Sequence, residues 1–125
     1  MTEKIAKIFI LDDESAIKEN LTLFLESEGF EAVSYSTAEN ALGDIISGKK
    51  YALGIVDIRL PGMNGEEFIQ KACKYLPEMK YIIHTGSVNF EINNELAQIG
   101  ICEKDIFKKP VVKIREMVNR IKELI

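Results

Sequence analysis

Apolar residues along this chain fall into short continuous runs, separated by longer stretches in which apolar positions recur with a helical period. The runs at residues 4–11, 51–57 and 80–85 are rich in β-branched residues, which is typical of strands buried within a sheet. Residues 31–36 alternate as a further strand, and a last strand is expected near residues 103–108. The pattern therefore predicts five strands.

The intervening stretches predict helices. The first of them places Leu21 and Leu25 on one helical face, and Gly29 follows where a helix end favours a left-handed residue. Residues 36–39 (STAE) offer a capping box for the second helix, and Pro110 suits the start of the last one. The expected helices are residues 16–28, 38–47, 66–75, 89–99 and 110–124.

Strict alternation of strands and helices predicts an α/β fold with a parallel sheet, because parallel strands need crossover connections and these are right-handed. At 125 residues the chain has room for one domain, and we expect residues 1–125 to form it. The doubly wound, flavodoxin-like order 2-1-3-4-5, with helices on both faces, is the natural one at this size. In such sheets ligands bind at the carboxyl ends of the strands.

Composition and charge narrow the function. The chain carries 20 acidic and 16 basic residues, a net charge of −4, which argues against direct binding of nucleic acid. No apolar run is long enough for a signal peptide or a membrane span, so we expect a cytoplasmic protein without membrane contact. Cys73, Cys102 and the lone His84 match neither a zinc site nor a disulfide framework.

Chemically distinctive residues follow the predicted strands at one edge of the sheet. Asp12 and Asp13 come after the first strand and Asp57 ends the third, so these three carboxylates should converge. Carboxylates this close repel one another unless a cation lies among them, and hard oxygen ligands suit Mg²⁺. Thr85 ends the fourth strand and Lys109 follows the fifth. The alternative is that these acidic residues merely end strands. That alternative does not explain why the three acids, Thr85 and Lys109 all fall at one edge of the sheet.

A carboxylate can act as a nucleophile towards phosphorus. Asp57 is the best candidate, because it stands alone at the end of a central strand whereas Asp12 and Asp13 form a pair. Lys109 could then neutralise charge on a phosphoryl group, and the Thr85 hydroxyl could donate a hydrogen bond to it.

Four segments carrying these residues resemble the receiver domain of two-component response regulators, over the whole chain and in that family's order. They are ILDDES (10–15), VDIRLPGMNG (56–65), HTG (84–86) and FKKP (107–110).

The resemblance implies that the chain is a phosphoacceptor rather than a turnover enzyme. Asp57 would accept a phosphoryl group from a sensor histidine kinase or a histidine phosphotransfer protein. Asp13, Asp57 and the backbone carbonyl of Arg59 would bind Mg²⁺, with Asp12 acting through water. Thr85 and Lys109 would be the switch hydroxyl and the phosphate-contacting cation, and the Lys109-Pro110 bond is expected to be cis.

The resemblance also implies an output through the fourth helix, fifth strand and fifth helix, towards an effector domain, a downstream protein or a second copy of the chain. The family's switch aromatic falls here on Ile106, counting back from the Lys109-Pro110 pair. The stretch between Gly100 and Lys109 is about two residues longer than the family's usual one. A register slip that puts Phe107 in the switch position is therefore the alternative.

Three other functions share parts of this pattern. A haloacid-dehalogenase-like phosphatase also uses an Asp nucleophile with Mg²⁺, but it has a second Asp where this chain has Arg59. A flavodoxin-like binder needs a phosphate-cradling loop after the first strand, where the acidic residues 12–14 would repel phosphate. A docking module that works without phosphorylation would not need the intact acidic set.

Two further expectations concern neighbours of the site. Alternation along the fourth strand turns His84 away from Thr85, which favours a packed, structural histidine. Arg59 and Ser87 flank the predicted site and are expected to tune phosphate hydrolysis by shaping water access.

Overall fold

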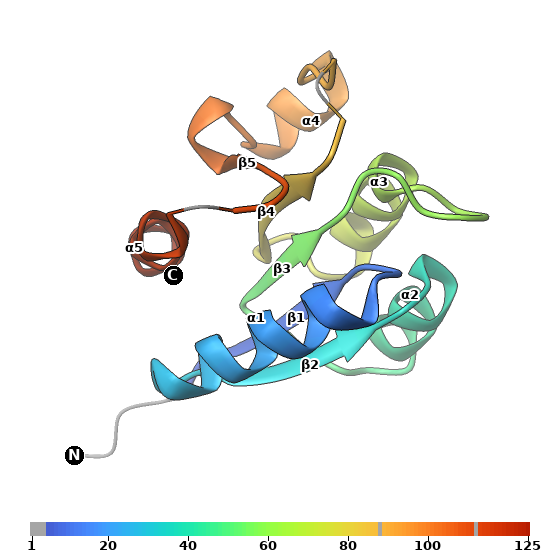
Figure 1. Cartoon of the computed structure of the whole chain (residues 1–125). Coiled ribbons are helices and arrows are strands. Elements are labelled where there is room, and N and C mark those ends of the chain that lie inside the picture. Colours follow the sequence, from blue (N-terminus) through green and yellow to red (C-terminus); the bar gives the residue numbers. More distant parts are fainter. Residues whose placement is uncertain (1–4, 88, 112) are drawn as a thin grey trace.

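The computed structural model describes residues 5–87, 89–111 and 113–125, and it contains one five-stranded parallel sheet in the order β2-β1-β3-β4-β5 (Figure 1). The predicted fold class is confirmed. The strands are β1 (Lys7–Leu11), β2 (Glu31–Tyr35), β3 (Leu53–Val56), β4 (Lys80–Thr85) and β5 (Ile106–Lys108). Lys4, where the first strand was expected to begin, lies outside the described residues.

Helices cover both faces of the sheet, with α1 and α5 on one side and α2, α3 and α4 on the other (Figure 1). Their bounds are α1 (Ser15–Ser27), α2 (Ala38–Ile46), α3 (Gly65–Tyr75), α4 (Asn94–Ile99) and α5 (Ile114–Leu124). Alternating residues of each buried strand point to opposite faces, so that Ile8 and Ile10 face α1 and α5 while Phe9 and Leu11 face α2 and α3.

The two faces differ in character. The α1/α5 side is mainly aliphatic, whereas the α2/α3 side holds an edge-to-face cluster in which the rings of Tyr35, Tyr51 and Phe68 surround Phe9 at centroid distances of 5.1 to 6.0 Å. Gly54 makes room for this cluster, because a Cβ there would lie 2.2 Å from the Phe9 ring. This close packing fixes β1 against β3, the two strands whose ends carry the acidic residues.

The segment before β5 differs from the prediction of one strand over residues 103–108. Glu103–Asp105 form a 3₁₀ turn, closed by the Asp105 amide donating to the Cys102 carbonyl at 2.9 Å, and only Ile106–Lys108 pair with β4. The Asp105 carboxylate accepts from the Cys102 amide at 2.9 Å, which stabilises the turn over a continued strand.

Three helix starts also differ from the prediction. The N-cap of α2 is Thr37, whose hydroxyl accepts from the Asn40 amide, so the expected box is shifted by one residue. Helix α4 begins only at Asn94, because the Asn93 side chain caps it. Pro110 does not start α5, since the Lys109 amide still bonds to Thr85 of the sheet and the chain must return over the sheet before Ile114. The Lys109-Pro110 peptide is cis, as expected.

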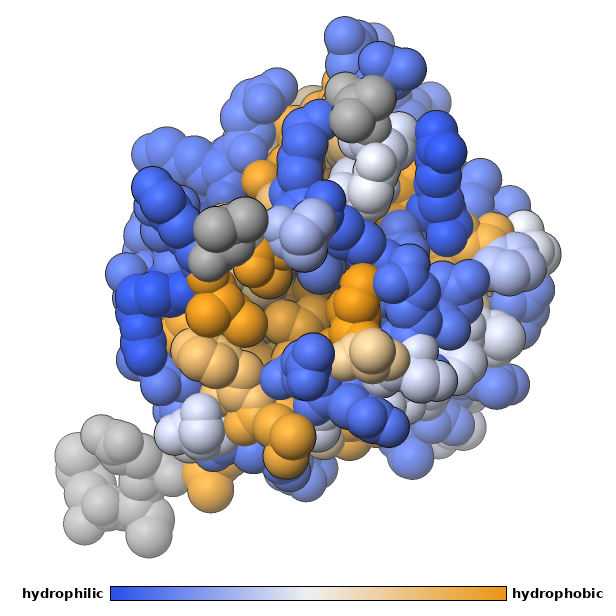
Figure 2. All heavy atoms as spheres, in the orientation of Figure 1, coloured by the Kyte–Doolittle hydropathy of each residue, from blue (hydrophilic) through white to orange (hydrophobic). Residues whose placement is uncertain are grey.

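The outer surface is largely hydrophilic, and on the face shown in Figure 2 apolar residues show through near the centre between charged side chains. Large apolar side chains that are well exposed include Ile5, Leu23, Ile46, Tyr75 and Ile125. Within the described part of the chain, every helix is too short or too polar to cross a membrane.

Candidate functional site: an acidic pocket at the carboxyl edge of the sheet

The site lies where the sheet ends, in the loops that follow β1, β3, β4 and β5. The Asp57 amide donates to the Leu11 carbonyl at 2.9 Å, so that the end of β3 lies beside the end of β1. On the other side, the Lys109 amide donates to the Thr85 carbonyl at 2.9 Å. Backbone pairing therefore brings the predicted acidic residues, hydroxyl and lysine to one place.

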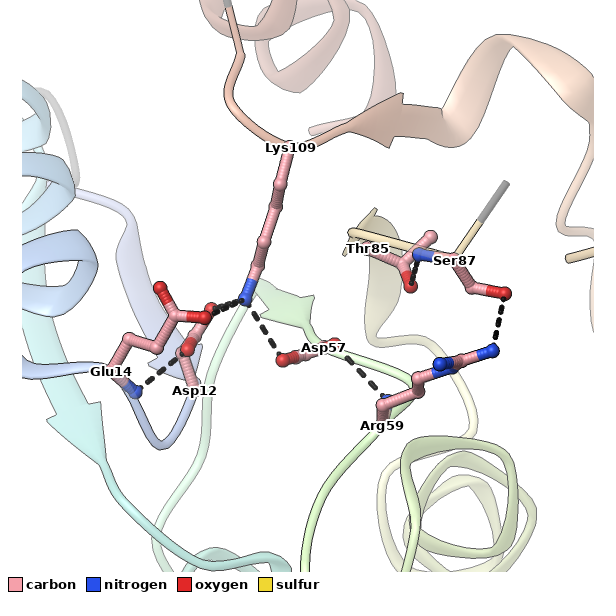
Figure 3. A network of polar contacts seen from close by, with 7 residues as sticks. All are labelled: Asp12, Glu14, Asp57, Arg59, Thr85, Ser87 and Lys109. Atoms are coloured by element: carbon pink, nitrogen blue, oxygen red, sulfur yellow. Dashed lines mark hydrogen bonds and ion pairs between the residues drawn. The ribbon is translucent and has the colours of Figure 1, made fainter. Parts of the chain in front are cut away.

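Lys109 lies at the centre of this pocket (Figure 3). Its ammonium group is 2.7 Å from Asp12 Oδ2 and 2.9 Å from Asp57 Oδ2. A third carboxylate, that of Glu14, lies 3.7 Å away. The side chains of Asp12, Asp57 and Lys109 are only 2%, 5% and 10% exposed, which makes these ion pairs much less screened than surface pairs. Glu14 was not among the predicted site residues, although the run of acids at 12–14 was a signal for it.

Burial and charge act against each other in the pocket. Burial raises the pKa of Asp57, and the hydrogen bond from Lys109 only partly offsets this. Burial by itself would lower the pKa of Lys109, but its hydrogen bonds to Asp12 and Asp57 outweigh that effect and raise it. Lys109 is thus held in its charged form between two carboxylates.

The acidic residues fit a divalent cation. Asp12, Asp13 and Asp57 each offer a carboxylate oxygen, and these oxygens all lie within 4.8 Å of one another. Asp12 and Asp57 are buried, whereas Asp13 is exposed and open to an incoming ion. Mg²⁺ prefers hard oxygen donors, and it is favoured where carboxylates outnumber nearby cations. The prediction that these three residues converge is confirmed by their geometry.

The loop after Asp57 is shaped by the glycine at its end. A Cβ on Gly65 would lie 2.4 Å from the Asp57 carbonyl oxygen, so only glycine lets the first turn of α3 approach the site this closely. At the start of the same loop, the Arg59 amide donates to Asp57 Oδ1 at 3.1 Å. Both contacts fix the direction of the Asp57 carboxylate.

Thr85 and Ser87 form the opposite wall of the pocket (Figure 3). Thr85 is fully buried, and its hydroxyl oxygen accepts a hydrogen bond from the Ser87 amide at 3.1 Å. The Arg59 guanidinium reaches across from the other wall and donates to the Ser87 hydroxyl at 3.3 Å. Arg59 and Ser87 therefore do flank the site, as expected, and in addition they contact each other.

The strand register decides where Ile106 and Phe107 point. Ile106 pairs with Ile83 and packs on the α2/α3/α4 side, the side that Thr85 shares with Ile83 by alternation. Phe107 pairs with His84 and packs on the α1/α5 side. Thr85 itself pairs with Lys108, so Ile106 lies on the same face as Thr85 but one step along the strand, beside Ile83.

His84 is buried at 2% exposure, and neither ring nitrogen has a hydrogen-bond partner. Burial, together with the nearby positive charge of Lys109, lowers its pKa to about 4. The imidazole is therefore neutral near pH 7. This is the packed histidine that the alternation predicted, outside the acidic pocket.

Comparison with known proteins agrees with this geometry. A family model for the response regulator receiver domain matches residues 8–122. The transcriptional regulatory protein FixJ of Bradyrhizobium diazoefficiens is 27% identical over 110 residues, which is 88% of this chain and 52% of FixJ. The chain thus spans about half the length of that relative.

Two solved structures are similar over nearly the whole chain. A response regulator receiver domain protein (CheY-like) from Methanospirillum hungatei is 34% identical with a TM-score of 0.84, covering 96% of this chain and 93% of that one. The response regulator protein TrrA of Thermotoga maritima, in complex with Mg²⁺-BeF, is 27% identical with a TM-score of 0.81, covering 97% of this chain and 100% of TrrA.

Proposed function

Because the chain belongs to the response regulator receiver domain family, we propose that Asp57 accepts a phosphoryl group from a sensor histidine kinase or a histidine phosphotransfer protein. Residues 1–125 act as one receiver domain in this proposal. The observation that carries it is the buried Asp57 carboxylate, 2.9 Å from Lys109 and within 4.8 Å of two further acids. The family assignment removes the haloacid-dehalogenase-like phosphatase alternative.

The transfer itself is a displacement at phosphorus. A carboxylate oxygen of Asp57 attacks the phosphorus of a phosphohistidine, the P–N bond breaks, and its electron pair leaves with the imidazole, which takes up a proton. The ionised form of Asp57 is the one that attacks, and Lys109 moves its contact from Asp57 Oδ2 to a phosphoryl oxygen. The Thr85 hydroxyl, which accepts from Ser87 in this structure, turns to donate to the phosphoryl group.

Magnesium belongs to the same proposal. Asp13, Asp57 and the Arg59 carbonyl would hold the ion directly, and Asp12 would act through water. When bound, Mg²⁺ neutralises the negative charge that the acids and the phosphoryl group bring together. The Arg59 amide donates a hydrogen bond to Asp57 Oδ1. Asp57 Oδ2, which is paired with Lys109 in this structure, is therefore the oxygen that can change partner.

The output follows from the position of Ile106 on the face of the sheet that Thr85 shares. Displacement of the hydroxyl frees space on the face that Ile106 shares, so repacking there changes the surface made by α4, β5 and α5. That surface controls a downstream protein, an effector domain or a second copy of the chain. The domain works in the cytoplasm as a phosphoacceptor that also loses its phosphoryl group by hydrolysis, without turning over a substrate.

Mass spectrometry tests the acceptor. Incubation with Mg²⁺ and a small phosphodonor should add one phosphoryl group that hydroxylamine removes, and Asp57→Asn should abolish the addition. Asp44→Asn is the matched control, because Asp44 bonds to Tyr35 far from the pocket and its loss should leave phosphorylation unchanged. Incorporation into Asp57→Asn equal to that of the parent would disprove the assignment, and incorporation that persists in EDTA would remove Mg²⁺ from it.

A further inference from the structure

A second buried carboxylate lies outside the acidic pocket, at the start of β5. The Asp105 side chain is 2% exposed, and its Oδ1 accepts from Arg120 Nε of α5 at 2.7 Å. Its other oxygen accepts from the Cys102 amide at 2.9 Å. Both carboxylate oxygens are therefore engaged, one by the turn and one by the helix.

This pair lies at the opposite end of β5 from the acidic pocket. Strand β5 has only three residues and pairs with β4 alone, so the ladder holds it weakly. The residues that flank it on both sides form ion pairs: Lys109 bonds to Asp12 and Asp57, and Asp105 bonds to Arg120. When Lys109 changes its partner, the resulting movement therefore acts on a short strand. The other end of that strand is bonded to α5 through Asp105.

Helix α5 has a second ion pair that provides a comparison. Arg115 donates two hydrogen bonds to Glu28 at the end of α1, at 2.6 and 3.1 Å. Glu28 lies at the end of α1 remote from the acidic residues 12–14. The two pairs hold the same helix, but only the Asp105 pair joins it to the strand that leads to Lys109.

We propose that Asp105 and Arg120 are positioning residues for the switch, which couple β5 to α5 and favour the strand position in which Lys109 contacts the free Asp57 carboxylate. This inference rests on the proposed phosphorylation of Asp57. Ile106 directly follows Asp105 and pairs with Ile83, so a restraint on Asp105 also restrains a side chain on the face that Thr85 shares. The pair acts through Ile106 and Lys109 and touches neither the phosphoryl group nor the metal.

Asp105→Asn tests the coupling, because asparagine keeps an acceptor for the Cys102 amide and loses the charge that Arg120 requires. We expect the variant to bind beryllofluoride, with Mg²⁺ present, about fivefold more tightly than the parent, since coupling between sites commonly has this size. Amide chemical shifts should show beryllofluoride-induced changes around residues 57 and 85 in both proteins. The changes over residues 114–124 should shrink in the variant, because β5 no longer moves the helix.

Two further variants make the result specific. Arg120→Gln removes the same pair from the side of α5 and should tighten binding to the same extent, and combining it with Asp105→Asn should add nothing. Glu28→Gln breaks the other α5 pair, so it should lower the melting temperature while leaving both the beryllofluoride affinity and the α5 shifts as in the parent.

The outcomes separate this inference from the function on which it rests. If the parent responds at residues 57 and 85 but Asp105→Asn and Arg120→Gln match it in affinity and in their α5 shifts, the coupling is wrong and the function stands. An equal gain in affinity in Glu28→Gln would also overturn it, because any loosening of α5 would then suffice. A parent that shows no response to beryllofluoride would overturn both.

Discussion

Two buried ionic clusters among the described residues balance their charges differently. In the acidic pocket a single cation, Lys109, serves the buried carboxylates of Asp12 and Asp57, with Glu14 and Asp13 close by. At the start of β5, the buried Asp105 has Arg120 as its own cation and a backbone donor for its second oxygen.

The difference separates a site with room for a ligand from a contact that joins two elements of the fold. A buried carboxylate without a full set of partners costs stability, and such a cost is retained where a bound ion or group supplies what is missing. A buried carboxylate with all its partners costs little, and removing it leaves the partner cation unpaired. Surplus negative charge therefore marks the pocket as the place where positive charge binds.

The largest expected effect comes from deleting one acid in each cluster. Asp105→Ala should lower the free energy of unfolding by about 2 kcal/mol, below the range for fully buried pairs because Arg120 is 18% exposed. Asp13→Ala should leave the free energy unchanged or raise it, because repulsion is relieved, yet it should weaken Mg²⁺ binding at least about tenfold. Urea unfolding followed by circular dichroism in EDTA, and Mg²⁺ titration by NMR, measure the two quantities.

The comparison breaks if both variants lose stability alike in metal-free buffer. Asp13 would then serve the fold, and surplus charge would not distinguish the two clusters.

An effect of similar size at pH 5, which shrinks towards zero at pH 7, is expected from His84, and it tests whether burial or the acidic surroundings control protonation beside the pocket. The unfolded chain takes up a proton on His84 near pH 6.5, whereas the folded chain does so only near pH 4. Stability is therefore lost as the pH falls from 6.5 towards 4, by about 2 kcal/mol at pH 5. His84→Leu should remove that part of the decline, which melting curves between pH 7 and pH 5 will show.

His84 is the only histidine in the chain, so its proton resonances give an independent readout. A measured pKa at or above 6.5 would mean that the negative charge of Asp12 outweighs burial. In that case His84→Leu would not remove any of the parent's decline in stability with falling pH.

The smallest effect concerns the mouth of the pocket, where contacts are longer. Ser87→Ala removes the acceptor that the Arg59 guanidinium reaches at 3.3 Å and should open the site to water. We expect the half-life of the aspartyl phosphate to fall about two- to fivefold, the size of one modest hydrogen bond. Phosphate release after removal of the donor measures it, with Ser47→Ala at the end of α2 as the control. An unchanged half-life would show that Arg59 and Ser87 do not limit access.

Much of the fold and of the site could be predicted because both depend on short-range patterns. Continuous apolar runs locate β1, β3 and β4, and in a parallel sheet the residue after each run must lie at the carboxyl edge. Asp12, Asp57 and Thr85 are placed by that rule alone. Ile106 could be placed only by counting back from Lys109, and its part in the switch stays a prediction; the structure shows that it begins β5 directly after the 3₁₀ turn.

The remaining features depend on contacts between segments far apart in the sequence. The pairing of Asp105 with Arg120 depends on where α5 crosses the sheet. The apolar periodicity of the helix does not specify that position to within one turn. For the same reason, the expected strand over residues 103–108 was correct only for Ile106–Lys108, since burial of the Asp105 carboxylate stabilises a turn over Glu103–Asp105. The contact between Arg59 and Ser87 likewise joins two loops whose relative position the sequence does not give.

The close approach of Gly65 to Asp57 has a consequence for the direction in which the pocket can change shape. On that side, backbone lies against backbone, and the start of α3 cannot shift without moving the carboxylate itself. On the other side, the contacts of Ser87 involve side chains: its amide donates to the Thr85 hydroxyl at 3.1 Å, and its own hydroxyl accepts from Arg59 at 3.3 Å. The wall of the pocket at α3 is therefore rigid, and the wall at Ser87 yields more easily. A bound group should displace residues towards β4, α4 and β5, while the α3 side stays in place.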